Sequence, residues 1–238
     1  MPSAKPIPAR ERLIVALDVP DREDALALVE TLGESVAFYK LGLELAMSGA
    51  YFDLMAELKA RGKKVFADLK FFDIPQTVAS AVRGLARHRP DFATVHGNDA
   101  ILKAAADAKG EVKILAVTVL TSLDRGDLDD LGFQADAEAL VLSRARRALA
   151  LGCDGVVSSG LEAARLRSEL GERLLVVVPG IRPVANRPTD DQKRAVDVED
   201  AFRLGADYIV VGRPIRDAAS PRDAAMAIQA RIADIFGR

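Results

Sequence analysis

Cysteine, histidine and tryptophan are scarce: the 238 residues include one cysteine, two histidines and no tryptophan. A single thiol, Cys153, excludes an internal disulfide, and with only His88 and His96 beside it a structural zinc site lacks ligands. No apolar run is long enough to span a bilayer. The opening MPSAKPIPAR is broken by prolines and lacks the apolar core of a signal peptide. We therefore expect a cytoplasmic protein whose residues 1–10 form a loose tail.

An excess of charge of one sign is also missing. Lys plus Arg (33) nearly balance Asp plus Glu (35), which leaves a formal charge of -2. This balance does not indicate a nucleic acid or an anionic membrane as a partner. Half of the residues are apolar, so the chain can bury a sizeable core. Because no linker or shift in composition divides it, we expect residues 11–238 to form one catalytic domain.

Short β-branched runs alternate eight times with longer runs of helical periodicity that are rich in Ala, Leu, Arg and Glu. The expected strands cover residues 13–19, 37–43, 64–70, 92–97, 113–120, 155–160, 174–181 and 208–215. Apolar strands covered by helices are typical of a parallel sheet, and eight such units favour a closed (β/α)₈ TIM barrel. The alternative is a doubly wound open sheet. It normally carries a Gly-rich turn after its first strand, where this chain reads LDVPDRED.

Charged side chains gather near the ends of the first three expected strands. Asp18, Lys40, Asp68 and Lys70 lie there, and the alternation of strand side chains puts Asp68 and Lys70 on the same face. Active sites of such barrels lie at the carboxyl ends of the strands. Isolated buried charges are costly, whereas two carboxylates and two ammonium groups can neutralise one another. The array predicts an active site, with a purely structural ion network as the alternative.

Glycine–arginine pairs follow the last two expected strands, in PGIRP (179–183) and VGRPI (211–215). Glycine lets backbone amides approach a ligand closely, and the arginine fork suits phosphate oxygens. Because such barrels often bind phosphate after strands 7 and 8, the pairs predict a phosphorylated substrate. The alternative for each pair is a turn glycine beside a solubilising arginine. The long polar segment 184–200 between them predicts a lid, or else a disordered insertion.

A family resemblance rests on these motifs. DLKFFDIPQT (68–77) resembles the D-x-K-x-x-D-[IV]-[GP]-x-T signature of the orotidine 5′-monophosphate decarboxylase family. Further stretches resemble its bacterial form in the same order, namely LIVALDV, FYKLGLEL, TVHG, VTVLTSLD, VVPGIRP, DDQKR and VGRPI. The resemblance implies a homodimer of (β/α)₈ barrels that decarboxylates orotidine 5′-monophosphate to UMP. This is the last step of UMP synthesis, and the family uses no metal or organic cofactor.

The resemblance also implies roles for individual residues of the charge array. Lys70 would donate a proton to C6 of the pyrimidine, and Asp68 would lie beside the departing carboxylate. Lys40 and Asp18 would complete the array and bind the ribose hydroxyls. By this resemblance Lys70, Asp68 and Lys40 are catalytic residues.

Other residues would bind the substrate from further away. By the same resemblance, Asp73 is a fourth catalytic residue and reaches, together with Thr77, into the site of the neighbouring subunit. Thr121 would touch the pyrimidine. The residues implied at the phosphate are Arg182, Gln192, Gly212 and Arg213, with Gln192 bridging the phosphate and the base from the lid.

Two other functions stay open at this point. A Mg²⁺-dependent lyase of the keto-gulonate phosphate decarboxylase or hexulose phosphate synthase type would share Asp68, Lys70 and Asp73. Such lyases carry a carboxylate where this chain has Lys40, because Mg²⁺ requires oxygen ligands. A non-catalytic barrel that binds a phosphorylated ligand would need the phosphate motifs, but it would not need two Lys/Asp pairs.

Overall fold

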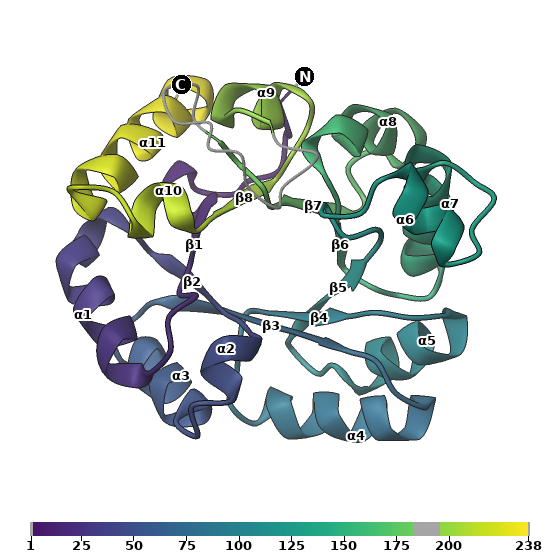
Figure 1. Ribbon diagram of the computed structural model, residues 1–238, viewed down its shortest axis with the longest axis horizontal. Helices are drawn as coiled ribbons and strands as arrows, with labels where there is room; N and C mark the ends of the chain where they lie inside the picture. The colour runs from purple at the N-terminus through teal and green to yellow at the C-terminus, as the bar shows by residue number, and fades with distance from the viewer. Residues whose placement is uncertain (1, 183–195, 238) are drawn as a thin grey trace.

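Eight parallel strands close into a barrel in chain order, with helices around the outside (Figure 1). The computed structural model describes residues 2–182 and 196–237. The strands are β1 (Leu13–Ala16), β2 (Phe38–Leu41), β3 (Lys64–Phe71), β4 (Phe92–Val95), β5 (Lys113–Val117), β6 (Gly155–Val157), β7 (Leu175–Val178) and β8 (Tyr208–Val211). Because β1 pairs with both β2 and β8, the sheet has no free edge. The predicted (β/α)₈ barrel is confirmed.

Helices connect successive strands on the outside of the barrel. They are α1 (Arg22–Leu32), α2 (Leu43–Ala46), α3 (Tyr51–Ala60), α4 (Pro75–Ala86), α5 (Asp99–Ala108), α6 (Arg125–Asp130), α7 (Ala137–Ala150), α8 (Gly160–Leu170), α9 (Val198–Arg203), α10 (Arg213–Arg216) and α11 (Pro221–Phe236), with short 3₁₀ turns at Ala9–Glu11 and Gly33–Ser35. Side-chain oxygens cap several N-termini, for example Asp21 on α1 and Ser220 on α11. None of the helices in the described ranges is long and apolar enough to cross a membrane.

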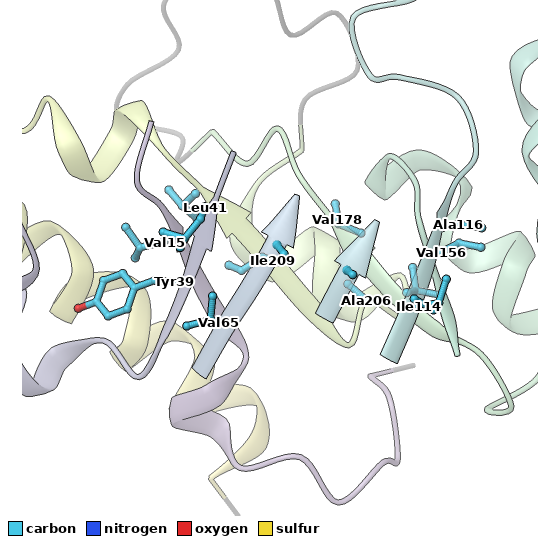
Figure 2. Packing of buried hydrophobic residues seen from close by; sticks show 14 of the residues in the cluster. Val15, Tyr39, Leu41, Val65, Ile114, Ala116, Val156, Val178, Ala206 and Ile209 are labelled. Carbon is cyan, nitrogen blue, oxygen red and sulfur yellow. The ribbon is translucent and has the colours of Figure 1, made fainter. Parts of the chain in front are cut away.

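The core has two layers, because strand side chains alternate between the two faces of the sheet. Tyr39 and Leu41 of β2 point outward and pack beneath the helices together with residues such as Val15 (Figure 2). Phe38 of the same strand points inward and fills the barrel. Lys40 follows Phe38 by two residues, so it also points inward, but it lies closer to the carboxyl ends. The same two-residue step takes β3 from the inward Phe66 to Asp68.

Several strands end earlier than predicted. The expected strand 208–215 stops at Val211, and α10 begins at Arg213. Pro214 explains part of the difference, since proline has no N–H for a strand ladder but fits the first turn of a helix. Asp18 likewise lies two residues beyond the end of β1, in irregular backbone. The polar residues at these strand ends are therefore held by loops and by a short helix.

In the expected loose tail over residues 1–10, two of the described residues are tied to the barrel. Ser3 is buried, and its hydroxyl donates a hydrogen bond to Asp207 Oδ1 at 2.5 Å. Lys5 Nζ lies 3.1 Å from Asp207 Oδ2 and 2.9 Å from Glu172 Oε2. Asp207 is fully buried, so its carboxylate requires charged or polar partners. The N-terminal segment supplies some of them and is thereby tied to the barrel.

Candidate active site

A cavity of about 430 Å³ lies at the carboxyl ends of the strands. It brings together eight residues expected from the sequence: Asp18, Lys40, Asp68, Lys70, Thr121, Arg182, Gly212 and Arg213. Asp73 and Thr77 are exposed and do not line this cavity, so their role at a neighbouring subunit's site stays a prediction. Gln192 and most of the expected lid lie outside the described residues.

The four charged residues form a chain of alternating sign along one wall of the cavity. Lys40 Nζ lies 3.0 Å from Asp18 Oδ1 and 3.5 Å from Asp68 Oδ2. Lys70 Nζ lies 3.0 Å from the same Asp68 Oδ2. Each carboxylate therefore contacts an ammonium group, and Asp68 contacts two. The mutual neutralisation that the sequence suggested is present in the geometry.

The backbone of Lys70 departs from a regular strand. Its φ is +47°, in the left-handed region that non-glycine residues rarely adopt, and the register between β3 and β4 shifts between Ala67 and Phe71. In this distorted segment the N–H of Lys70 donates to Thr94 Oγ1 at 2.9 Å, and the Thr94 hydroxyl donates to Asp68 Oδ1 at 2.8 Å. Asp68 and Lys70 do converge, as predicted, but a bulge held by Thr94 sets their positions rather than strand alternation alone.

Burial and neighbouring charges shift the pKa values of Asp68 and Lys40 in opposite directions. Burial by itself favours neutral Asp68, but Lys40 and Lys70, with hydrogen bonds from Lys70 and Thr94, outweigh it and lower the pKa of Asp68. Burial likewise favours neutral Lys40, but Asp68 and Asp18 outweigh it and raise the pKa of Lys40. Both side chains are therefore charged at neutral pH.

Two glycines, Gly42 and Gly212, lie next to the ion pair between Lys40 and Asp18 and leave room for it. A Cβ atom on Gly42 would lie 3.2 Å from Lys40 Nζ and 3.3 Å from Asp18 Oδ1. A Cβ atom on Gly212 would lie 3.5 Å from Asp18 Oδ2. The backbone at both positions thus packs directly against the charged groups. A side chain at position 42 would press on both charged groups, which would have to move by a few tenths of an ångström.

The other side of the cavity carries the two glycine–arginine motifs. β7 and β8 pair through Val178 and Ile209, so the segments that follow them are neighbours. Gly180 has a φ of +73°, which only glycine adopts without strain, and Arg182 is buried. The N–H of Arg182 donates to the carbonyl of Val196 at 2.9 Å, which joins the chain just before the expected lid to the described last part of that lid. Arg182, Gly212 and Arg213 together form a basic end suited to a phosphate.

Three polar residues of the site were not among the expected binding residues. Thr94 binds Asp68 and Lys70, and Ser122 and Arg216 line the cavity. The sequence did indicate that Thr94 points into the barrel, because it follows the inward-pointing Phe92 by two residues. Arg216 follows Arg213 by one helical turn, but its contacts depend on the distant β1 end and are not visible in the sequence.

The arrangement provides an ammonium group at one side of a cavity and a phosphate-suited end at the other. Lys70 can stabilise negative charge that develops next to it and can then deliver a proton. The rest of the lining is largely apolar, with Ala16, Phe66, Val117 and Val210 among its residues. Such a lining suits the ring of an organic substrate.

The chain is similar to known proteins over nearly its whole length. Residues 11–228 match the model of the "Orotidine 5'-phosphate decarboxylase / HUMPS family". The orotidine 5′-phosphate decarboxylase of Methylococcus capsulatus is 68% identical over 98% of this chain and 97% of its own length. That of Xanthomonas oryzae pv. oryzae is 52% identical over 98% and 96%. The crystal structure of orotidine 5′-phosphate decarboxylase from Lactobacillus acidophilus superposes with a TM-score of 0.83 at 35% identity, covering 93% of this chain and 99% of that one. The chain therefore belongs to the orotidine 5′-phosphate decarboxylase / HUMPS family.

Proposed function

We propose that this chain decarboxylates orotidine 5′-monophosphate to UMP and CO₂, the last step of de novo UMP synthesis, without a metal or an organic cofactor. The observation that carries the proposal is the Asp18–Lys40–Asp68–Lys70 chain beside the cavity. The family name covers more than one activity, so membership alone does not choose between them. The relatives named above carry the decarboxylase name, which supports the same choice.

Lys70 is the residue that acts at the reacting carbon. Loss of CO₂ from C6 leaves a carbanion that the pyrimidine ring stabilises poorly, so the barrier comes mainly from developing negative charge. The Lys70 ammonium lies at the cavity and is held by Asp68 at 3.0 Å, so it is oriented before the substrate arrives. It stabilises the carbanion as it forms and then transfers a proton to C6.

Asp68 contributes by repelling the substrate carboxylate. Two like charges about 4 Å apart interact by about 4 kcal/mol at an effective dielectric constant of about 20. This repulsion disappears when the carboxylate leaves as neutral CO₂. We rank the contribution below that of Lys70, which acts directly on the charge that forms in the transition state.

The remaining contacts bind the parts of the substrate that do not react. In the proposal Asp18 and Lys40 bind the ribose hydroxyls, and Thr121 touches the base. The phosphate is bound by Arg182, Gln192, Gly212 and Arg213; for Gln192 the support is the sequence resemblance alone. Binding energy from the remote phosphate can hold the charge array and the lid in their reactive arrangement, so it serves turnover as well as affinity.

The active form in this proposal is a cytoplasmic homodimer in which Asp73 and Thr77 reach the neighbouring site. Exposed apolar residues beside Asp73 support it. Phe72 and Ile74 are 68% and 66% exposed, so large apolar side chains flank Asp73 on both sides at the surface. A second copy of the chain would cover them and would bring Asp73 to a cavity other than its own.

Lys40 separates this proposal from a Mg²⁺-dependent lyase. Its ammonium group lies between the carboxylates of Asp18 and Asp68, at the position where a divalent cation would find its oxygen ligands. A metal ion there would have to displace a buried ammonium that both carboxylates stabilise.

The test is to follow the absorbance of orotidine 5′-monophosphate with the purified protein in EDTA. Decay of the substrate signal in EDTA is the expected result. A requirement for added Mg²⁺ would instead support the lyase, and tight binding without turnover would support a binding protein.

A further inference from the structure

Arg216, the last residue of α10, bonds to residues on two sides. Its Nη1 donates a hydrogen bond to the main-chain carbonyl of Asp18. Its Nε and Nη2 donate to the two carboxylate oxygens of Asp217, at 2.6 Å and 3.1 Å. The side chain is 27% exposed and lines the cavity. Figure 1 shows α10 next to β1, the strand that leads to Asp18.

Among the four residues of the charge array, Asp18 depends most on a contact that holds its main chain in place. It lies in irregular backbone after β1, and its side chain is 44% exposed, against 12% for Lys40 and Asp68. Its carboxylate must nevertheless stay 3.0 Å from Lys40 Nζ. The guanidinium is planar, and its Nε and Nη2 also bind the carboxylate of Asp217, so these two contacts orient Nη1 toward the carbonyl of Asp18.

We propose that Arg216 is a positioning residue that holds the main chain of Asp18, and so joins the phosphate-binding helix α10 to the charge array. The inference rests on the proposed function. It gives Arg216 a different role from Arg213 at the start of the same helix: Arg213 binds the phosphate, whereas Arg216 acts through Asp18. With Asp18 held, Lys40 keeps both of its carboxylate partners.

A double-mutant cycle between Arg216 and Asp18 tests this role. Arg216→Ala is expected to lower kcat/KM for orotidine 5′-monophosphate about tenfold, the size expected for one hydrogen bond from a charged group. In an Asp18→Ala background the same substitution should cause no further loss, because the carboxylate it positions is gone. Losses that multiply in the double variant would overturn the proposal, since Arg216 would then act independently of Asp18. An unchanged kcat/KM in Arg216→Ala would also overturn it.

Two further variants separate positioning from general damage to the fold. Lysine in place of Arg216 can still donate to the Asp18 carbonyl but cannot bind both oxygens of Asp217, so Arg216→Lys should recover part of the lost kcat/KM. Arg165→Ala is the matched control. It removes an arginine whose ion pair with Glu138, at 2.9 Å, lies on the outer helices away from the cavity. It should leave kcat/KM unchanged, whereas an equal loss in this control would overturn a specific role for Arg216.

A measurement without turnover keeps this inference distinct from the proposed function. In a ¹³C-lysine NMR titration, Arg216→Ala should lower the pKa of Lys40, because its partner Asp18 is no longer held while Asp68 remains. If the wild-type protein failed to decarboxylate the substrate, the proposed function would fail but this titration would still decide the positioning role. An unchanged Lys40 titration would contradict it.

Discussion

The main-chain N–H of Lys70 donates a hydrogen bond to the hydroxyl of Thr94, across two neighbouring strands, at 2.9 Å. The same hydroxyl donates to Asp68, so one buried threonine fixes the backbone of the proposed proton donor and the carboxylate beside it. The left-handed backbone of Lys70 is unfavourable in itself and persists because these contacts hold it. The proposed proton donor is therefore positioned by β4 as well as by its own strand.

Replacing Thr94 with valine tests this arrangement. Thr94→Val keeps the shape but removes the hydroxyl, which leaves the N–H of Lys70 and one oxygen of Asp68 without their partner. We expect a loss of about 1–3 kcal/mol in the free energy of unfolding and a lower kcat with a smaller change in KM, measured by denaturant titration and steady-state kinetics.

Thr118→Val is the matched control for that substitution. Thr118 is buried too, and its hydroxyl donates to the carbonyl of Val157 at 2.8 Å, outside the charge array. Thr118→Val should lower the free energy of unfolding without lowering kcat. If both variants lowered kcat equally, a specific role of Thr94 would be contradicted.

The charge array should also give a defined dependence of stability on pH. The pKa of Asp68 is lowered by folding, so its contribution is complete above the unfolded value of about 3.9 and is lost as the pH falls through the folded value. The pKa of Lys40 is raised, so its contribution is complete below about 10.4 and is lost as the pH rises through the folded value. Between about pH 4 and pH 10 both contributions are therefore constant.

Comparison of the wild type with Asp68→Asn isolates the part of this pH dependence that lies at acidic pH. We expect the difference in unfolding free energy between the wild type and this variant to be constant near neutral pH and to shrink below about pH 4. Denaturant titrations at a series of pH values measure it. A difference that grew on acidification would show that Asp68 is not stabilised in its charged form.

The N-terminal segment should contribute to stability without affecting catalysis. Lys5→Met removes an ammonium group from the buried carboxylate of Asp207, which keeps Arg167 and the N–H of Val176 as partners. Because part of the network remains, we expect a loss of about 1–3 kcal/mol in the free energy of unfolding and an unchanged kcat.

Lys103→Met provides the comparison for that loss. Lys103 forms an ion pair with Asp107 on the exposed face of α5, and its removal should change stability by less than about 1 kcal/mol. Equal effects of the two substitutions would mean that the N-terminal segment is not anchored through Asp207.

Much of this molecule could be predicted from its sequence, because the relevant signals are local. The alternation of strands and helices fixed the barrel, and the two-residue step of inward side chains indicated Lys40 and Asp68. The glycine–arginine motifs lie on adjacent strands, so they meet as expected. These features need no knowledge of contacts between distant segments.

The features that escaped prediction depend on contacts between distant parts of the chain. Lys70 looks like an ordinary strand residue in the sequence, but its backbone is left-handed and its N–H binds Thr94 of the next strand. Ser3 and Lys5 stand in a proline-rich, polar stretch, and nothing near them shows that Asp207 will be buried beside them. The periodicity of a sequence shows toward which side of a strand or helix a side chain points. It does not show which residues from distant parts of the chain contact that side chain.

The central claim is that the Lys70 ammonium stabilises the developing carbanion and protonates it. The most direct measurement compares Lys70→Ala with the wild type for both UMP affinity and decarboxylation of orotidine 5′-monophosphate, with circular dichroism to confirm folding. We predict that kcat falls by at least about 10³-fold while UMP binds within about tenfold of the wild type. Retention of turnover near the wild-type rate in the folded variant would contradict it.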